Sequence, residues 1–129
     1  GTIYVLRSHS KHPFVSEHRE LIHKIGVTGG KVESRIANAA RDATYLLADV
    51  EVVASYKLAG INRIKLEKML HQIFAAAQIE LTINDRFGHP VKPKEWFLVP
   101  LHVIDEAVSL IINGSITELR YDPEQAALV

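Results

Sequence analysis

Apolar and polar residues alternate with helical spacing over residues 60–78, which form the clearest predicted helix of the chain. Apolar side chains recur three or four positions apart and share one face, namely Leu66, Met69, Leu70, Ile73, Phe74 and Ala77. No proline interrupts the run, and Gly60 precedes it where a turn belongs. Glu67 and His71 are one helical turn apart at the margin of this face. We expect both to face a cleft or a neighbouring strand, and this helix to carry the functional site.

Four runs of β-branched and aromatic residues predict strands. They cover residues 2–7, 21–28, 49–58 and 95–99. The first two strands are close in sequence, which favours antiparallel pairing, although the irregular loop expected over 8–20 is longer than a tight hairpin.

Two further helices complete the predicted fold. One is expected over 31–42, with inward-facing positions at Val32, Ile36, Ala39, Ala40 and Ala43. The other follows a proline and covers 101–112. Residues 79–94 are rich in turn formers and are expected to be mostly loop, whereas an edge strand near 116–121 precedes a frayed tail. The order ββαβαβα predicts an α+β fold with helices flanking a small, mostly antiparallel sheet.

Composition narrows the class of protein. The 129 residues suffice for a single domain with its own core, expected over 1–129. Hydrophobic residues make up 47% and charged residues 23%, as in soluble globular proteins. The absence of cysteine excludes disulfides and thiolate metal sites and fits a cytoplasmic location. No apolar run approaches the roughly 18 residues of a membrane span, so no membrane partner is expected.

The net charge of zero conceals an asymmetry along the chain. Residues 1–100 carry 14 Lys/Arg against 10 Asp/Glu, whereas residues 101–129 carry 1 against 5. A domain that binds nucleic acid tightly on its own is usually far more basic, because phosphate neutralisation drives non-specific affinity. The charge therefore disfavours a strong stand-alone DNA binder but allows a catalytic module that another domain or partner delivers to DNA. The first residue, glycine rather than methionine, suggests a fragment of a longer protein.

Five short motifs follow one another in order and each falls on a predicted element. They are Gly1-Thr2-Ile3-Tyr4, Lys24-Ile25-Gly26 continuing to Thr28, Arg35 nine residues after Gly26, Leu66–His71, and Glu95-Trp96-Phe97. This series resembles the motifs of the GIY-YIG nuclease superfamily, and most closely its bacteriophage-ORF branch. The resemblance covers about residues 1–100, the motif-bearing core, and leaves 101–129 as a C-terminal helix and tail.

The resemblance implies metal-dependent hydrolysis of DNA phosphodiester bonds. Glu67 would hold one Mg²⁺ (or Mn²⁺), a hard cation that needs only one protein carboxylate because it keeps several waters. Arg35 would clamp the scissile phosphate through its planar guanidinium. Tyr4 would deprotonate or orient the attacking water. A phenol ordinarily titrates near pH 10, so it needs a nearby cation to act as a base at neutral pH, and Lys24 would supply that positive field.

Three further residues complete the expected site. His71 would bind phosphate or support Glu67. Gly26 and Thr28, both within the second motif, are expected to bind substrate.

Each of these residues also has an ordinary structural interpretation. Tyr4 suits strand packing, and Lys24 suits a solvent-facing strand position. Arg35 and Glu67 suit helix-surface charges or a structural ion pair. Trp96-Phe97 suits the core better than a base-stacking platform, and the scattered histidines do not indicate zinc.

Two functions of different class therefore remain from sequence. The first is a metal-dependent endonuclease, or the catalytic domain of one. The second is a non-catalytic GIY-YIG-fold module that binds nucleic acid or a protein partner. The nuclease hypothesis requires Tyr4, Lys24, Arg35 and Glu67 to converge on one concave surface.

Overall fold

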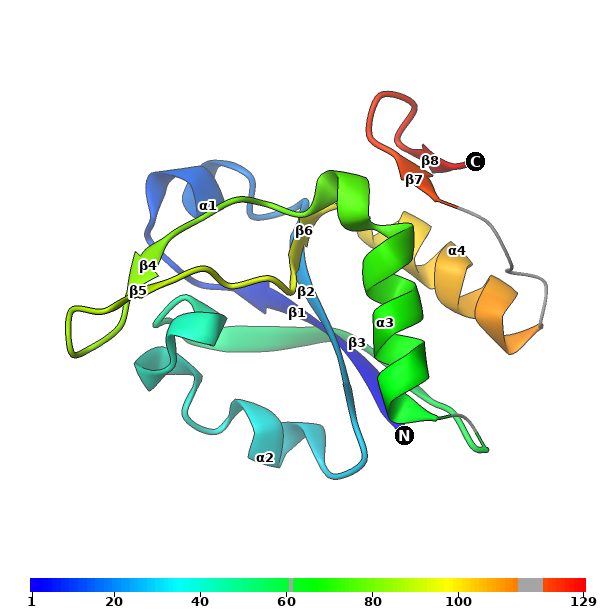
Figure 1. Cartoon of the computed structure of the whole chain (residues 1–129), viewed down its shortest axis with the longest axis horizontal. Coiled ribbons are helices and arrows are strands. Elements are labelled where there is room, and N and C mark those ends of the chain that lie inside the picture. The colour runs from blue at the N-terminus through cyan, green and yellow to red at the C-terminus, as the bar shows by residue number, and fades with distance from the viewer. Residues whose placement is uncertain (61, 114–119) are drawn as a thin grey trace.

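The N-terminal strand β1 (Thr2–Ser8) lies inside a four-stranded antiparallel sheet of order β3-β1-β2-β6 (Figure 1). Its neighbours are β2 (Ile22–Thr28) and the edge strand β3 (Val50–Lys57), and β6 (Trp96–Leu98) closes the other edge. The computed structural model describes residues 1–60, 62–113 and 120–129. This architecture confirms the predicted α+β fold and the antiparallel pairing of the first two strands.

The register of β1 and β2 assigns the two faces of the sheet. Tyr4 lies opposite Gly26 and Leu6 opposite Lys24. Alternate strand residues point to opposite faces, so these four share one face. The other face carries Ile3, Val5, Ile25 and Val27, which belong to the largest hydrophobic cluster.

Two helices cover that apolar face. The helix α3 (Arg63–Ile73) begins at Asn62, whose Oδ1 accepts a hydrogen bond from the Lys65 amide at 3.1 Å. The helix α4 (Leu101–Ile112) begins after Pro100, as predicted. Both contribute buried side chains to the same cluster. The acidic C-terminal part of the chain thus helps to cover the sheet.

The opposite face is covered by shorter elements. These are the helix α2 (Val32–Ile36) and two 3₁₀ turns, η1 (Ala39–Arg41) and η2 (Ala43–Tyr45). Tyr4, Leu6, Ala39 and Tyr45 form the buried cluster on this side. The side chain of Trp96 fastens η2 to the sheet, since its Nε1 donates to the Thr44 carbonyl at 2.9 Å.

Two predicted helices are shorter than their sequence patterns indicated. The helix predicted over 31–42 ends at Ile36 and gives way to η1, and Ala40 is exposed rather than inward. Alanines bury little apolar area, so they specify a helical face weakly. The helix predicted over 60–78 ends at Ile73 and is followed by the 3₁₀ turn η3 (Ala75–Ala77). Met69 was wrongly placed inward, because it is 36% exposed.

Several predicted loops contain structure. Residues 8–20 include the helix α1 (Pro13–Glu17). Residues 79–94 form a small hairpin of β4 (Ile83–Asn84) and β5 (Pro90–Val91). At the C-terminus, 116–119 lie outside the described residues.

The C-terminal tail is more ordered than the predicted frayed end. The strand β7 (Tyr121–Asp122) pairs with β8 (Ala127–Leu128) rather than with the main sheet. Within the described ranges, none of the helices has the length and hydropathy to cross a bilayer.

Candidate functional site

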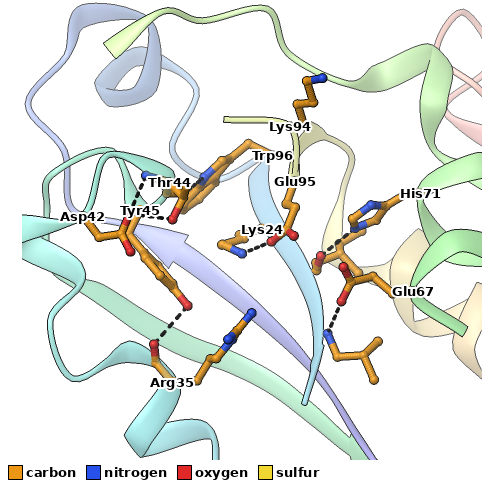
Figure 2. Close-up of polar contacts among 12 residues, drawn as sticks. Lys24, Arg35, Asp42, Thr44, Tyr45, Glu67, His71, Lys94, Glu95 and Trp96 are labelled. Carbon is orange, nitrogen blue, oxygen red and sulfur yellow. Dashed lines mark hydrogen bonds and ion pairs between the residues drawn. The ribbon is translucent and has the colours of Figure 1, made fainter. Parts of the chain in front are cut away.

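The strand β6 covers only the start of β2, and side chains of α3 replace it further along. β6 pairs with residues 22–24 of β2. Beyond that point, His71 Nε2 donates to the Ile25 carbonyl at 2.9 Å, and Glu67 Oε2 accepts from the Val27 amide at 3.1 Å (Figure 2). A buried backbone group without a partner is costly, so these two side chains complete the free edge of β2. The prediction that both face a neighbouring strand is confirmed.

An open pocket of about 600 Å³ lies along this edge. Its lining residues are Val27, Arg63, Ile64, Glu67, Lys68, His71, Gln72 and Ala75. Glu67 is half-buried, and its Oε1 has no hydrogen bond or ion pair within the described part of the chain. One carboxylate oxygen is therefore held by the backbone while the other is available to a ligand.

On the opposite face of the sheet, Tyr4 and Lys24 form a buried pair. Their exposures are 1% and 2%, respectively. Lys24 Nζ lies 5.7 Å from the centre of the Tyr4 ring and 4.9 Å from that of Tyr45. The same ammonium forms an ion pair with Glu95 (Figure 2). The expectation that Lys24 stands beside Tyr4 is confirmed, whereas its solvent-facing alternative is wrong.

Arg35 is the exposed member of this group and comes from α2. Its pKa is raised above the usual value, chiefly by a hydrogen-bonding contact with the Tyr4 side chain and secondly by the Tyr4 charge. Tyr45 donates its hydroxyl to the Arg35 carbonyl at 3.0 Å, and burial, followed by the proximity of Tyr4, raises the pKa of Tyr45. Both tyrosines thus contact Arg35, Tyr4 at the guanidinium and Tyr45 at the backbone carbonyl.

A second open pocket, of about 390 Å³, lies beside Arg35. Cationic, acidic and aromatic residues line it together, namely Lys24, Arg35, Asp42, Thr44, Tyr45, Lys92, Pro93, Lys94 and Glu95. A pocket with this lining suits a phosphate-containing ligand, because guanidinium and ammonium groups are the usual phosphate partners.

The predicted residues thus gather in two groups that flank β2. Tyr4, Lys24 and Arg35 meet on one face, while Glu67 and His71 lie at the free edge and line a different pocket. The convergence on one concave surface that the nuclease hypothesis required is therefore not found, because Glu67 and Arg35 line separate pockets with no lining residue in common. Among the described residues Arg35 and Glu67 form no ion pair with each other, so that structural alternative is excluded.

Gly26 and Thr28 occupy positions that explain their residue types locally. A Cβ on Gly26 would lie 2.4 Å from Cζ and from the hydroxyl oxygen of Tyr4, so the glycine makes room for the ring. Thr28 Oγ1 accepts from the Gly30 amide at 3.2 Å and shapes the turn after β2. Their expected contact with substrate stays a prediction.

Two residues beside the site were not predicted from the sequence to be functional. Glu95 belongs to the Glu-Trp-Phe motif, and that position could have indicated a partner for Lys24. Tyr45 carries no such signal, since only the 3₁₀ turn brings it beside Tyr4. Trp96 and Phe97 are both fully buried, which confirms their assignment to the core.

The donor set at the free edge suits a hard divalent cation held by one carboxylate. No three His, Cys, Asp or Glu side chains converge as a metal-binding group in residues 1–60, 62–113 and 120–129. Mg²⁺ binds through one or two carboxylates and keeps several waters, and the pocket beside Glu67 has room for them. The hydrogen bond from the Val27 amide fixes the orientation of the Glu67 carboxylate.

Fold and site together define a small α+β domain with an open pocket on each side of one strand, one lined by Arg35 and lysines and the other by Glu67 and His71. The family model that matches this chain is the T5orf172 domain, over residues 1–112, and the chain belongs to that family. The family is a phage-associated, nuclease-like one.

One relative is the uncharacterized protein YeeC of Bacillus subtilis (strain 168), which is 42% identical over 115 residues. The match covers 86% of the chain but only 30% of that protein, so the chain spans less than a third of its relative's length. No solved structure matches the chain.

Proposed function

We propose that this domain is the catalytic part of a metal-dependent endonuclease that hydrolyses phosphodiester bonds in DNA, as its resemblance to GIY-YIG nucleases implies. Membership in a nuclease-like family supports the proposal. The observation that carries it is the grouping of Tyr4, Lys24 and Arg35 on one face of β2. Glu67 lies at the free edge of the same strand and lines another pocket, so the proposal requires the bound DNA to reach both pockets.

Arg35 binds the scissile phosphate in this mechanism. It is exposed and lines an open pocket, and a guanidinium can form paired hydrogen bonds with phosphate oxygens. Its contact with Tyr4 places the phenol beside the guanidinium that would bind the phosphate. As a phenolate, Tyr4 would orient the attacking water and accept its proton, returning to the neutral phenol, while Lys24 supplies positive charge beside the ring.

Glu67 would hold one Mg²⁺ (or Mn²⁺) through Oε1. A bound divalent ion supplies charge neutralisation at the phosphate and at the leaving oxygen. His71 holds α3 against β2, since its Nε2 donates a hydrogen bond to the Ile25 carbonyl. Gly26 acts through Tyr4, whose ring it accommodates, and Thr28 shapes the turn that borders the site.

A second function, a non-catalytic module that binds nucleic acid, has one observation in its favour. Tyr4 and Lys24 are almost inaccessible, and Glu95 already neutralises the lysine. A site that is closed in this way would bind phosphate through Arg35 without supplying a base. The same nuclease assay separates the two functions.

The test is nicking of supercoiled plasmid with Mg²⁺ or Mn²⁺, with EDTA as the blank. Glu67→Gln is the main variant, because the amide oxygen can still accept from Val27 while the metal-binding charge is lost. Arg35→Ala removes the phosphate clamp, and Lys57→Ala, an exposed lysine on β3, is the control.

We expect metal-dependent nicking by the wild type and the Lys57 variant, with a loss of about 100-fold or more in the other two. Nicking that survives Glu67→Gln would contradict the assigned site. Absence of nicking together with Arg35-dependent DNA binding would favour the binding module.

A further inference from the structure

A third hollow continues the Arg35 pocket toward the β4–β5 hairpin. It has a volume of about 520 Å³ and lies between η1–η2 and the turn of the hairpin. Asp42 and Thr44 line both hollows, so the two adjoin at these residues. In Figure 1 the hairpin projects beyond the sheet beside η1 and η2, away from α3. We call this combined surface the hairpin trough.

Cationic side chains line the hairpin trough along its length. Arg41 and Arg86 border its outer part, while Lys92 and Lys94 border the part near Arg35. All four are exposed, and none of them forms an ion pair with another described residue. The trough therefore presents positive charge to solvent in a chain whose net charge is zero.

The two aspartates of the trough are engaged by their own turns. Asp42 Oδ1 accepts from the amide and hydroxyl of Thr44 at 2.9 and 2.7 Å. Asp85 Oδ1 accepts from the amides of Phe87 and His89 at 2.8 and 2.9 Å. The pKa of Asp85 is lowered, most of all by the hydrogen bond from His89. These carboxylates therefore stabilise their own turns, and the cationic side chains of the trough are available to bind an anionic ligand.

The tip of the hairpin carries an aromatic ring on a well-defined turn. Phe87 is 70% exposed, and the Arg86 guanidinium carbon lies 5.0 Å from the centre of its ring. Gly88 adopts φ +82° and its amide donates to the Asp85 carbonyl at 3.0 Å, which closes the turn. An exposed aromatic ring among cations is the arrangement on which unpaired nucleobases stack while phosphates meet the charges.

We propose that the hairpin trough binds an unpaired DNA strand next to the cleaved bond, with one base stacked on Phe87 and phosphates on Arg41, Lys92 and Lys94. This inference rests on the proposed function and names its substrate class as DNA with a single-stranded or flapped segment. Stacking requires an open base face, which duplex DNA does not offer. Because the net charge of the chain is zero, it gains little non-specific affinity for duplex DNA. The stacked base therefore supplies the discrimination between single-stranded and duplex DNA.

Binding is measured in EDTA by fluorescence anisotropy, so that cleavage plays no part. The probes are a fluorescein-labelled DNA oligonucleotide as a single strand, as a blunt duplex and as a flapped duplex, and an RNA strand of the same sequence. Phe87→Ala removes the ring and Phe87→Trp keeps it. Ile112→Ala, an exposed apolar residue on α4, is the matched control. A salt titration is repeated with Lys92→Ala and with Lys57→Ala.

We expect Phe87→Ala to weaken binding of single-stranded and flapped DNA by about fivefold or more, because the stacked base loses its partner. Phe87→Trp and Ile112→Ala should bind as the wild type does, and duplex affinity should stay unchanged. Lys92→Ala should reduce the salt slope by about 0.7, whereas Phe87→Ala should leave it unaltered.

Equal binding by the wild type and Phe87→Ala, an equal loss on single strand and duplex, or no binding of any probe would overturn the proposal. Tighter, Phe87-dependent binding of the RNA strand would overturn its assignment to DNA. Failure of plasmid nicking alongside Phe87-dependent DNA binding would instead count against the endonuclease alone.

Discussion

The ring of Tyr4 lies directly over Gly26 on the paired strand, closer than any side chain at position 26 would permit. A Cβ there would lie 2.4 Å from two atoms of the Tyr4 side chain and 2.8 Å from a third. Gly26 is thus the reason that Tyr4 can lie flat on the sheet with its hydroxyl beside Arg35. The glycine of the second motif and the tyrosine of the first form one structural unit.

Gly26→Ala should therefore displace Tyr4 and lower the free energy of unfolding by about 1–3 kcal/mol, the usual cost of overpacking a filled core. Plasmid nicking should fall with it, because the phenol leaves its place beside Arg35. Gly30→Ala is the control, since a Cβ there would meet only the Thr28 hydroxyl, at 4.0 Å. Thermal or urea unfolding measures the difference, and equal stability of the two variants would contradict this packing.

The ion pair of Lys24 and Glu95 is asymmetric in burial, and this asymmetry predicts unequal effects of substitution. The side chains are 3% and 31% exposed. Glu95→Ala should cost about 3 kcal/mol, because it leaves a buried ammonium without a counter-charge. Lys24→Met should cost less, since the carboxylate left behind still reaches water.

The double variant Lys24→Met with Glu95→Ala should recover part of the loss, as measured by urea unfolding of all four proteins. A single Glu95→Ala effect no larger than that of Lys24→Met would argue against an uncompensated charge. The same set also informs on function, because removing Glu95 frees Lys24 for a phosphate if the variant folds.

Apolar periodicity in the sequence was sufficient to predict the long helices and strands. It was not sufficient where contacts between distant elements determine the local structure. The helix carrying Leu66, Leu70 and Ile73 was found because large side chains recur on one face. The helix over 31–42 was overextended because its apolar positions are mostly alanine. The hairpin within 79–94 was missed because two-residue strands leave no alternating pattern.

The residues of the site were located by motif, whereas their partners were not. The Glu-Trp-Phe motif marks Glu95, but only the pairing of β6 with β2 shows that Lys24 is buried against it. Likewise, the role of Glu67 and His71 at the edge of β2 follows from the shortness of β6, which only the assembled sheet shows. Their positions on the helix were predictable and their hydrogen-bond partners were not.

Glu67 accepts a hydrogen bond from the backbone and is also the proposed metal ligand, and two substitutions separate these roles. Glu67→Ala leaves the Val27 amide unpaired and should cost about 1–3 kcal/mol, whereas Glu67→Gln should retain most of the stability. Hydrogen exchange of the Val27 amide, followed by NMR in EDTA, should accelerate in the alanine variant only. Equal exchange in both variants would mean that the carboxylate does not hold this edge of the sheet.

His23 makes the fold sensitive to acid in a way that can be traced to one side chain. It is fully buried, and burial lowers its pKa below 6.5. Its Nδ1 donates to the Val99 carbonyl at 2.8 Å, while its Nε2 lies 3.5 Å from an Arg7 guanidinium nitrogen, which donates to it. The folded protein therefore holds a neutral imidazole whose two nitrogens are both engaged.

Above pH 6.5 neither the folded nor the unfolded chain protonates His23. Below pH 6.5 the unfolded chain binds a proton at His23, whereas the folded chain does not. The free energy of unfolding therefore decreases until the pH reaches the lowered pKa of His23 in the folded protein. The slope from one such group is at most about 1.4 kcal/mol per pH unit. In His23→Asn the side-chain amide can still donate to Val99 but does not titrate, so urea unfolding between pH 8 and about pH 5 should show a flatter profile than the wild type. Parallel profiles would assign the acid sensitivity to other groups.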